Sequence, residues 1–347
     1  MNATNATNLL TDFGPLERIG HGHCGSVWGT LGLEPVDVNH GSARAVVKRE
    51  DASPGRDIQN EVSVQSQVSA CAMSGMLPRV LVPECFGFMS SLDERWTQLL
   101  PLLPAGFEGC RAMIAEKIEP VSTQAQLLLI DRYGPEEHRH ELRESLSCHG
   151  KREHCLARIY LGRRRQMHHN PDQRPQRPRF FSLRNFPIHS DQAEELHLPC
   201  EEYAKSMAEA LAVLHWRVRT NGADVEFVLG ACREAGTADV STPLGEHAIW
   251  MLDFDCSRPI EADESGLESI TRAFWRNDPY YPQPHSAHER DRQLWDIFAA
   301  EYRRVGMEVV RAYPREGEDV EVLCALVDGV LTKIVETKGK WKSGGHF

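Results

Sequence analysis

The chain has 347 residues, of which 41% are hydrophobic, so it can bury a sizeable core and is not disordered throughout. Its 39 basic and 50 acidic residues give a net charge of −11, which argues against a chain that as a whole coats nucleic acid or an anionic membrane. The sequence has no apolar run of the ~18 residues needed for a membrane span, and its ten scattered cysteines are typical of reduced thiols rather than of a disulfide scaffold. We therefore expect a cytoplasmic protein, with the nucleus as the alternative, and no membrane partner.

We expect a flexible leader at residues 1–12. After it, short runs rich in Val and Leu and punctuated by Gly, Pro and Asp predict a β-rich unit over residues 13–120. One helix, over about 57–68, interrupts these strands. From residue 121 to 347 helical periodicity dominates, most clearly over 201–219, where apolar residues recur at three- and four-residue spacing. Two further helices are expected at 289–311 and 319–337, with a break in the second at Asp328-Gly329.

Residues 151–184 carry ten basic and two acidic side chains, and three prolines predict a loop in the middle of this segment. We assign the segment to a basic insertion at about 135–184. It can recruit phosphate or an acidic protein partner, or it can be an exposed loop that pairs with the acidic remainder of the chain. Few aromatic residues alternate with the charges, which disfavours nucleic acid as the partner.

A glycine-rich segment, Gly20-His21-Gly22-His23-Cys24-Gly25-Ser26-Val27, fits the pattern G-x-G-x-x-G-x-V between two expected strands. Glycines let the backbone turn tightly, and the N–H groups exposed in such a turn bind anions such as polyphosphates. The strand that follows differs from the helix of a dinucleotide-binding site. Taken alone, the segment is equally compatible with a hairpin of no special role.

Three charged residues are candidates to act with this segment. Lys48 ends an apolar run, and Glu61 lies thirteen residues later in the expected helix, where it can hold the lysine. Asp253 follows the apolar strand 248–252, and a carboxylate in that position commonly holds a metal ion. Each of the three, taken singly, is also compatible with an ordinary surface charge or a turn cap.

In this order the features resemble the protein kinase-like fold, an α+β fold of two lobes with a small β-rich N-lobe and a larger helical C-lobe. The resemblance implies that ATP and Mg²⁺ bind between the lobes. It further implies a phosphate loop, a phosphate-binding lysine with its helix glutamate, a hinge for adenine and a metal ligand. In that order these are Gly20, Gly22, Gly25 and Val27; Lys48 and Glu61; Glu116 and Ile118; and Asp253.

More specifically, the chain is similar to a fungal family of uncharacterised kinase-like proteins that are often loosely labelled zinc finger proteins. The stretches that carry this likeness are 180–187, 224–229, 250–255 and 277–282. The likeness extends from about Arg18 to Trp295.

The catalytic loop departs from the kinase pattern H-R-D-x-x-x-x-N, in which the Asp orients the acceptor hydroxyl and the Asn holds a metal ion. Alignment on the following strand puts Asn221 at the Asp position and Glu226 at the Asn position. Because an amide cannot act as a carboxylate base, Asp224 becomes the candidate base, while Glu226 and Asp255 become candidate metal ligands beside Asp253. Two functions stay open: an ATP-dependent phosphotransferase acting on a small molecule, and a catalytically impaired, pseudokinase-like binding or regulatory module.

A third reading is a zinc-binding regulatory protein. Cys148, His149, His154 and Cys155 lie close together in the sequence, and Cys and His are the usual ligands of structural zinc. Their spacing does not match the regular pairs of known zinc sites. A solvated polar loop is the alternative.

Overall fold

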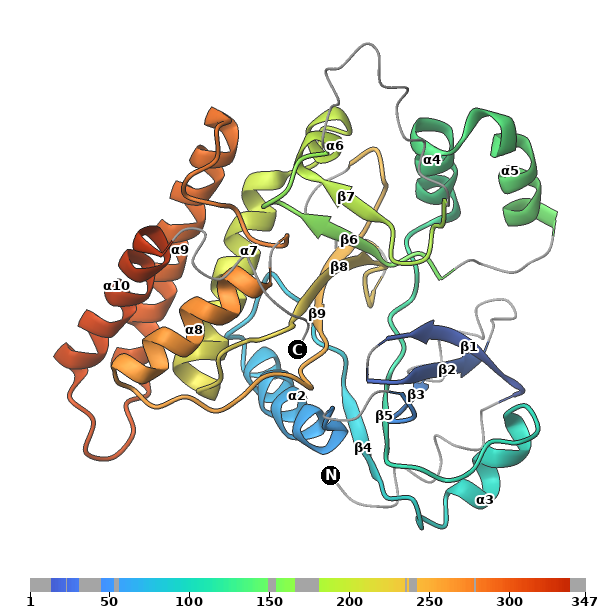
Figure 1. The fold of residues 1–347 in the computed structure, drawn as a ribbon, viewed down its shortest axis with the longest axis horizontal. Helices are drawn as coiled ribbons and strands as arrows, with labels where there is room; N and C mark the ends of the chain where they lie inside the picture. Colours follow the sequence, from blue (N-terminus) through green and yellow to red (C-terminus); the bar gives the residue numbers. More distant parts are fainter. Residues whose placement is uncertain are drawn as a thin grey trace.

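The computed structural model describes residues 14–22, 24–30, 45–52, 56–148, 154–165, 181–234, 236, 242–277 and 279–337. Within them the chain forms two β-sheets and a group of α-helices, so the expected α+β class is correct. The first sheet and one long helix come from residues before 120, and the second sheet and the other long helices come from residues after it (Figure 1).

The first sheet is antiparallel throughout, with the strand order β1-β2-β3-β5-β4. Its strands are Leu16–His21 (β1), Ser26–Thr30 (β2), Ala45–Arg49 (β3), Cys85–Met89 (β4) and Ala112–Glu116 (β5). Successive residues of β3 alternate between the two faces of the sheet, because Ala45 and Val47 join one apolar cluster and Val46 joins another. A short helix, Trp96–Leu99 (α3), contributes to the first of these clusters.

Helix Ile58–Met73 (α2) is the one that the sequence predicts near residue 57. Asp57 caps it, since its carboxylate accepts hydrogen bonds from the backbone N–H groups of Gln59 and Asn60. The helix runs five residues further than expected and ends before Gly75, whose φ of 81° suits the left-handed turn after a helix. α2 packs against β4 and β5.

The second sheet has four strands in the order β7-β6-β8-β9. They are Ala157–Tyr160 (β6), Pro187–His189 (β7), Glu226–Gly230 (β8) and Ala248–Leu252 (β9). β6 and β7 are parallel, whereas the other neighbouring strands are antiparallel. β6 and β7 were not expected, because β6 lies in a basic stretch read as loop and β7 has only three residues.

The remaining helices form most of the C-terminal part, and Figure 1 shows the four longest grouped on the side of the second sheet away from β1 and β2. They are Thr123–Tyr133 (α4), Arg139–Cys148 (α5), Ser190–Glu195 (α6), Cys200–Val213 (α7), Glu264–Arg276 (α8), Glu289–Ala312 (α9) and Val320–Glu336 (α10). α7 continues into a π-helical turn at Leu214–Val218 and packs along α9. The helices predicted near 201, 289 and 319 are thus present.

One detail of this prediction is wrong: α10 is not broken at Asp328-Gly329. A β-carbon at residue 329 would lie 3.2 Å from Leu267 of α8, so glycine serves there to let two helices approach closely. Residue 120, where a boundary is expected, lies between the end of β5 and the start of α4.

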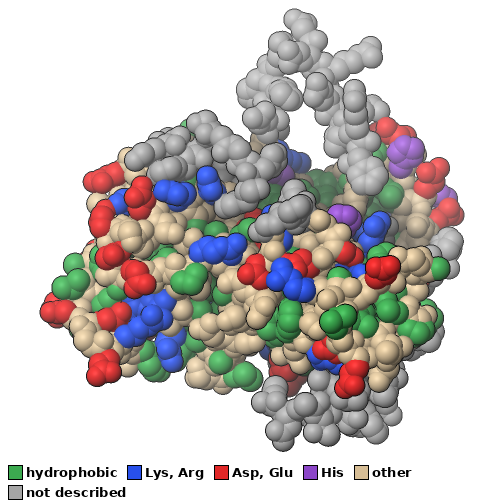
Figure 2. All heavy atoms as spheres, turned by 60° about the horizontal axis from the view of Figure 1, so that its bottom comes forward, with side chains coloured by type: hydrophobic (Ala, Val, Ile, Leu, Met, Phe, Trp, Pro, Cys, Tyr) green, Lys and Arg blue, Asp and Glu red, His purple; other side chains and the backbone are tan. Residues whose placement is uncertain are grey.

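The face of the molecule drawn in Figure 2 carries mixed charge. Figure 2 shows acidic and basic side chains interspersed over one face, with hydrophobic side chains scattered among them. None of the helices in the described part of the chain is both long enough and apolar enough to cross a membrane.

Candidate functional site

A cavity of about 660 Å³ lies between the two sheets. β1, β2 and β3 contribute Ile19, Val27 and Lys48 from one side, while β8 contributes Glu226 from the other. Every site residue expected from the sequence lines this cavity except Asn221 and Asp255. Segments that are far apart in the chain therefore meet around one space, as the motif order predicts.

The glycine-rich segment forms the turn between β1 and β2. The backbone N–H of Gly22 donates to the carbonyl of Gly25 over 2.9 Å. A β-carbon at Gly25 would lie 1.8 Å from the carbonyl oxygen of Arg49, so only glycine fits at this position. Asp51 anchors the turn, because its carboxylate accepts from both the backbone N–H and the hydroxyl of Ser26, at 2.8 and 2.7 Å.

Lys48 lies at the centre of the expected charged set. Its Nζ donates to Glu61 Oε1 over 2.7 Å and to Asp253 Oδ1 over 2.9 Å. Glu61 is 2% exposed on α2, and Asp253 directly follows β9. The structure thus brings together three residues that the sequence places up to 205 positions apart.

The burial of these groups changes their protonation. Burial raises the pKa of the Glu61 carboxyl to about 7, although Lys48 opposes the shift. Burial also disfavours the Lys48 ammonium, but Asp253 and Glu61 outweigh it and raise the pKa of this lysine. The pKa of Asp253 is lowered because its ion pair with Lys48 outweighs its burial. Asp253 is therefore the carboxylate of this set that stays ionised most firmly.

Backbone strain gathers at the same cavity. Asp224, Asp253 and Asn185 line it and have φ values of 65°, 69° and 53°. Non-glycine residues in this region are uncommon and are held there by the surrounding structure, often at functional sites. The two aspartates are candidates from the sequence, whereas the role of Asn185 was missed.

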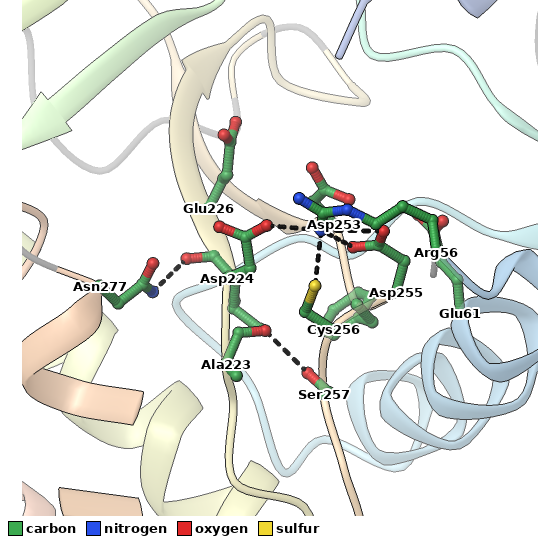
Figure 3. Close-up of polar contacts among 12 residues, drawn as sticks. Arg56, Glu61, Ala223, Asp224, Glu226, Asp253, Asp255, Cys256, Ser257 and Asn277 are labelled. Carbon is green, nitrogen blue, oxygen red and sulfur yellow. Dashed lines mark hydrogen bonds and ion pairs between the residues drawn. The ribbon is translucent and has the colours of Figure 1, made fainter. Parts of the chain in front are cut away.

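A second charged cluster lies beside the first (Figure 3). Asp224, Asp255 and Cys256 bring their carboxylate oxygens and sulfur within 4.8 Å of one another. Arg56 points into this group: its Nη1 lies 2.9 Å from Asp224 Oδ2 and 3.0 Å from Asp255 Oδ2, and it also contacts Cys256 Sγ. Burial raises the pKa of the Cys256 thiol to about 12, so the sulfur stays protonated. The guanidinium therefore supplies the positive charge that a metal ion would supply here.

The expected metal ligands consequently take different partners. Asp255 is fully buried and binds Arg56, and Glu226 binds Arg158 Nη2 over 2.7 Å. In Figure 3 the carboxylate of Glu226 points away from the Arg56 cluster. Within the described chain, Asp253, Glu226 and Asp255 do not form one cluster of metal-ligand atoms.

Asn221, the residue aligned with the kinase base, is used structurally. Its Nδ2 donates to Ser269 of α8, and its Oδ1 accepts from the backbone N–H groups of Ala223 and Arg258. These bonds hold the loop against α8 and the segment after β9. Asp224 is the loop residue that reaches the cavity instead.

The expected hinge connects β5 to the C-terminal part. The side chain of Glu116 accepts from Arg233 and from the backbone N–H of Glu84, so its charge is satisfied outside the sheet. Gly230 of β8 has no room for a side chain, because a β-carbon there would lie 2.6 Å from Ile118. The connection is thus packed tightly onto β8, and both Glu116 and Ile118 line the cavity.

Of the proposed zinc ligands, His149 and the side chain of Cys148 lie outside the described residues. His154 lines the cavity, whereas Cys155 is buried in the main apolar core. The two residues therefore lie in different surroundings, one at the cavity and one in the core.

The basic segment is described in part, since residues 151–153 and 166–180 lie outside the described ranges. Arg164 binds Glu194 and Asp291, and Arg165 binds Asp191 and Glu195. These arginines pair with the acidic remainder of the chain. Binding of an acidic protein partner by this segment stays a prediction.

Sequence reasoning missed several residues that shape the site. Arg56 lies just before the expected helix and belongs to none of the motifs, so spacing alone does not indicate its role. Arg158 comes from a strand that was not expected. Asp51 comes two residues after β3, and β3 pairs with β2 of the glycine-rich hairpin. This position was the signal in the sequence that could have indicated its contact with Ser26.

Comparison with known proteins adds one match. Residues 249–314, which include β9, Asp253 and the first part of the C-terminal helices, match a family model described as a zinc finger protein. The matched segment contains a single cysteine, Cys256, and two histidines, His285 and His288. Cys256 contacts Arg56, and His285 contacts the carbonyl of Val335, so the contacts of these residues do not describe a zinc site. No curated protein and no solved structure matches the chain.

Proposed function

We propose that the chain has a two-lobed, protein kinase-like fold and binds ATP with Mg²⁺ in the cavity beneath the glycine-rich hairpin. The observation that carries the proposal is the position of Lys48, which contacts both Glu61 on α2 and Asp253 after β9. A lysine held in this way can bind the α- and β-phosphates, and the cavity volume of about 660 Å³ lies within the range of small-molecule sites.

Each part of the nucleotide has candidate partners in this arrangement. The backbone of Glu116 and Ile118 would meet adenine, and the turn at Gly20, Gly22 and Gly25 would cover the phosphates. Of the three carboxylates expected to hold Mg²⁺, we retain Asp253, because Glu226 and Asp255 are paired with arginines. Carboxylate and phosphate oxygens are the usual ligands of Mg²⁺.

We propose further that the protein transfers the γ-phosphoryl group to a hydroxyl of a small molecule. In this step the hydroxyl oxygen forms a bond to the γ-phosphorus, the bond between that phosphorus and the bridging oxygen of ADP breaks, and the hydroxyl proton passes to the carboxylate of Asp224. Asp224 suits this role because it lines the cavity, with its side chain 33% exposed. Arg56 orients its carboxylate.

A second candidate function is a catalytically impaired module that binds nucleotide without turnover. The specific observation in its favour is that Asn221 is engaged with Ser269 while Asp224 is paired with Arg56, so the carboxylate available to a substrate is already neutralised by a cation. Both candidate functions require nucleotide binding, but only the phosphotransferase transfers the γ-phosphoryl group.

Isothermal titration calorimetry with Mg²⁺-ATP, followed by an assay of phosphoryl transfer to a pool of small metabolites, tests the proposal. We expect binding that is weakened by Lys48→Met and by Asp253→Asn, and unchanged by Arg143→Met, which alters an arginine paired with Asp131 at the surface. Transfer by the wild type supports the phosphotransferase, whereas binding without transfer supports the module. No binding of Mg²⁺-ATP contradicts both.

A further inference from the structure

The segment that leads into β6, together with the start of that strand, contributes a row of side chains to the cavity. His154, Leu156 and Arg158 line it, while the alternate residues Cys155 and Ala157 are fully buried in the main core. This alternation follows from the period of two in an extended chain. β6 thereby widens the floor of the cavity beyond the hairpin formed by β8 and β9.

The register of the sheet divides this floor into two regions. Leu156 packs against an apolar group formed by Ile118, Val228 and Trp250, which lies next to the expected hinge. Further along, Arg158 lies opposite Val228 and binds Glu226 at the beginning of β8 over 2.7 Å. The apolar region suits the adenine ring of a nucleotide. The polar region lies at the end of β8 that adjoins Asp224.

Polar atoms without partners occur on both sides of Leu156, in His154 before it and in Arg158 after it. Arg158 Nε, His154 Nε2 and Tyr280 Oη are buried and make no hydrogen bond within the described part of the chain. Tyr280 packs edge-on against Tyr160 of β6, with ring centroids 5.1 Å apart. Leaving a buried polar atom unpaired costs about 1–3 kcal/mol. His154 and Arg158 both line the cavity, so their unpaired atoms indicate that water or a ligand completes their hydrogen bonds.

Asn185 completes the region. This residue lines the cavity from the segment before β7, and its φ of 53° is a conformation that Asn tolerates better than most residues. The amide offers both a donor and an acceptor.

We propose that the cavity-lining residues of the segment 154–158, together with Asn185 and Glu226, form the acceptor subsite, and that its ligand is an uncharged, polyhydroxylated small molecule such as a sugar or a polyol. The inference rests on the proposed function, since it names the acceptor of the same cavity.

The charges of the region select this class. Arg158 and Glu226 neutralise each other, and burial lowers the pKa of His154 to about 4, so its imidazole is neutral at pH 7. A charged acceptor would enter without a free counter-charge on β6, at an electrostatic cost. A hydroxyl both donates and accepts hydrogen bonds, and therefore suits a carboxylate acceptor next to guanidinium and amide donors.

The test compares probes that share one skeleton and differ in charge. D-glucose, D-glucuronate and D-glucosamine form one set, and myo-inositol and glycerol extend the neutral class. Binding of each to the full chain is measured by saturation-transfer difference NMR, with and without ADP and Mg²⁺, while ADP affinity is measured in the same samples. We expect at least one neutral probe to bind, and its affinity to fall at least about tenfold, that is by about 1.4 kcal/mol, in Arg158→Met and in Asn185→Gly.

Asn185→Gly removes the amide while keeping a residue that accepts a positive φ, so it separates the loss of a ligand contact from the loss of the fold. Arg143→Met is the matched control and should leave binding unchanged, because Arg143 lies on the surface of α5. Binding of ADP without binding of any neutral probe, or binding of the charged probes alone, would overturn the inference and leave the nucleotide proposal intact. Binding of neutral probes without ADP would instead support the subsite and contradict the nucleotide proposal.

Discussion

The two sides of the cavity differ in how their polar atoms are satisfied. On the side of α2, Lys48 binds Glu61 and Asp253, and Arg56 binds Asp224 and Asp255, so most of the charge is matched by the chain itself. Glu61 Oε2 is the exception there, since it is buried without a partner in the part of the chain that is described. On the side of β6, several buried polar atoms lack partners. The comparison indicates that the first side is organised by folding, whereas the second is completed by what binds to it.

The α2 side is attached to the segment after β9 by two residues. Asn60 donates to the carbonyl of Ser257 over 2.8 Å, and Arg56 reaches Asp224 and Asp255 from the residue before the helix cap. These contacts hold α2 in the position that places Glu61 next to Lys48. The charged set is therefore assembled without any segment from outside the described chain.

The largest expected effect is on the rate of phosphoryl transfer. Asp224→Asn removes the proposed base but keeps the shape of the side chain, so transfer should fall about 10²–10⁴-fold while the affinity for Mg²⁺-ATP stays the same. Single-turnover kinetics measure the rate, and calorimetry measures the affinity. Asp131→Asn, at the surface, is the control. A transfer rate unchanged in Asp224→Asn would show that another group takes the proton.

The contact between Arg56 and the two aspartates should matter for stability. In Arg56→Ala the fully buried carboxylate of Asp255 loses its cation, so the free energy of unfolding should fall by about 3–5 kcal/mol. Urea denaturation followed by tryptophan fluorescence measures it, with Arg143→Ala as a control that should match the wild type. Equal stability of Arg56→Ala and the wild type would mean that the cluster is held by other contacts.

A smaller effect is expected for nucleotide affinity. Lys48→Met removes a charged donor, and hydrogen bonds to charged groups contribute about 1.5–3 kcal/mol, so the affinity for Mg²⁺-ATP should fall about tenfold or more. Fluorescence titration with a labelled ATP analogue measures the change. Lys205→Met, which alters a lysine that pairs with Glu202 on the surface of α7, should bind like the wild type. Equal affinities of Lys48→Met and the wild type would place the phosphates elsewhere.

The smallest effect concerns pH. The pKa of Glu61 is about 7 in the folded chain against an ordinary value of 4.5, so the folded state binds more protons between these values. The contribution of Glu61 to stability is therefore complete below about pH 4.5 and is lost as the pH rises through about 7, by at most about 1.4 kcal/mol per pH unit. Urea denaturation at pH 5, 6, 7 and 8 should show this decline in the wild type and a weaker one in Glu61→Gln. Parallel profiles of the two proteins would contradict a raised pKa.

The part of the site that the sequence predicts depends on local signals. Lys48 ends an apolar run, Glu61 lies in a helix with a recognisable start, and Asp253 follows another apolar run, so each position can be found from its own neighbourhood. The strands of the first sheet and the helices α2, α7, α9 and α10 are found in the same way, from periodicity and turn residues, whereas α8 was not expected.

The rest depends on contacts between distant segments. The pairing of Arg56 with Asp224 and Asp255 joins residues more than 160 positions apart, and no periodicity records it. β6 has only four residues and lies within the basic stretch, so its alternation of buried and half-buried side chains is too short to stand out in the sequence. Spacing alone therefore could not show that Asn221 would turn toward α8 and leave Asp224 at the cavity.

A crystal structure with Mg²⁺ and a non-hydrolysable ATP analogue tests the central claim most directly. The account predicts a triphosphate beneath the turn at Gly20–Gly25, with Lys48 Nζ within hydrogen-bond distance of its oxygens and Mg²⁺ bound by Asp253. A nucleotide bound outside this cavity, or a cavity that stays empty at a saturating concentration of the analogue, would contradict it.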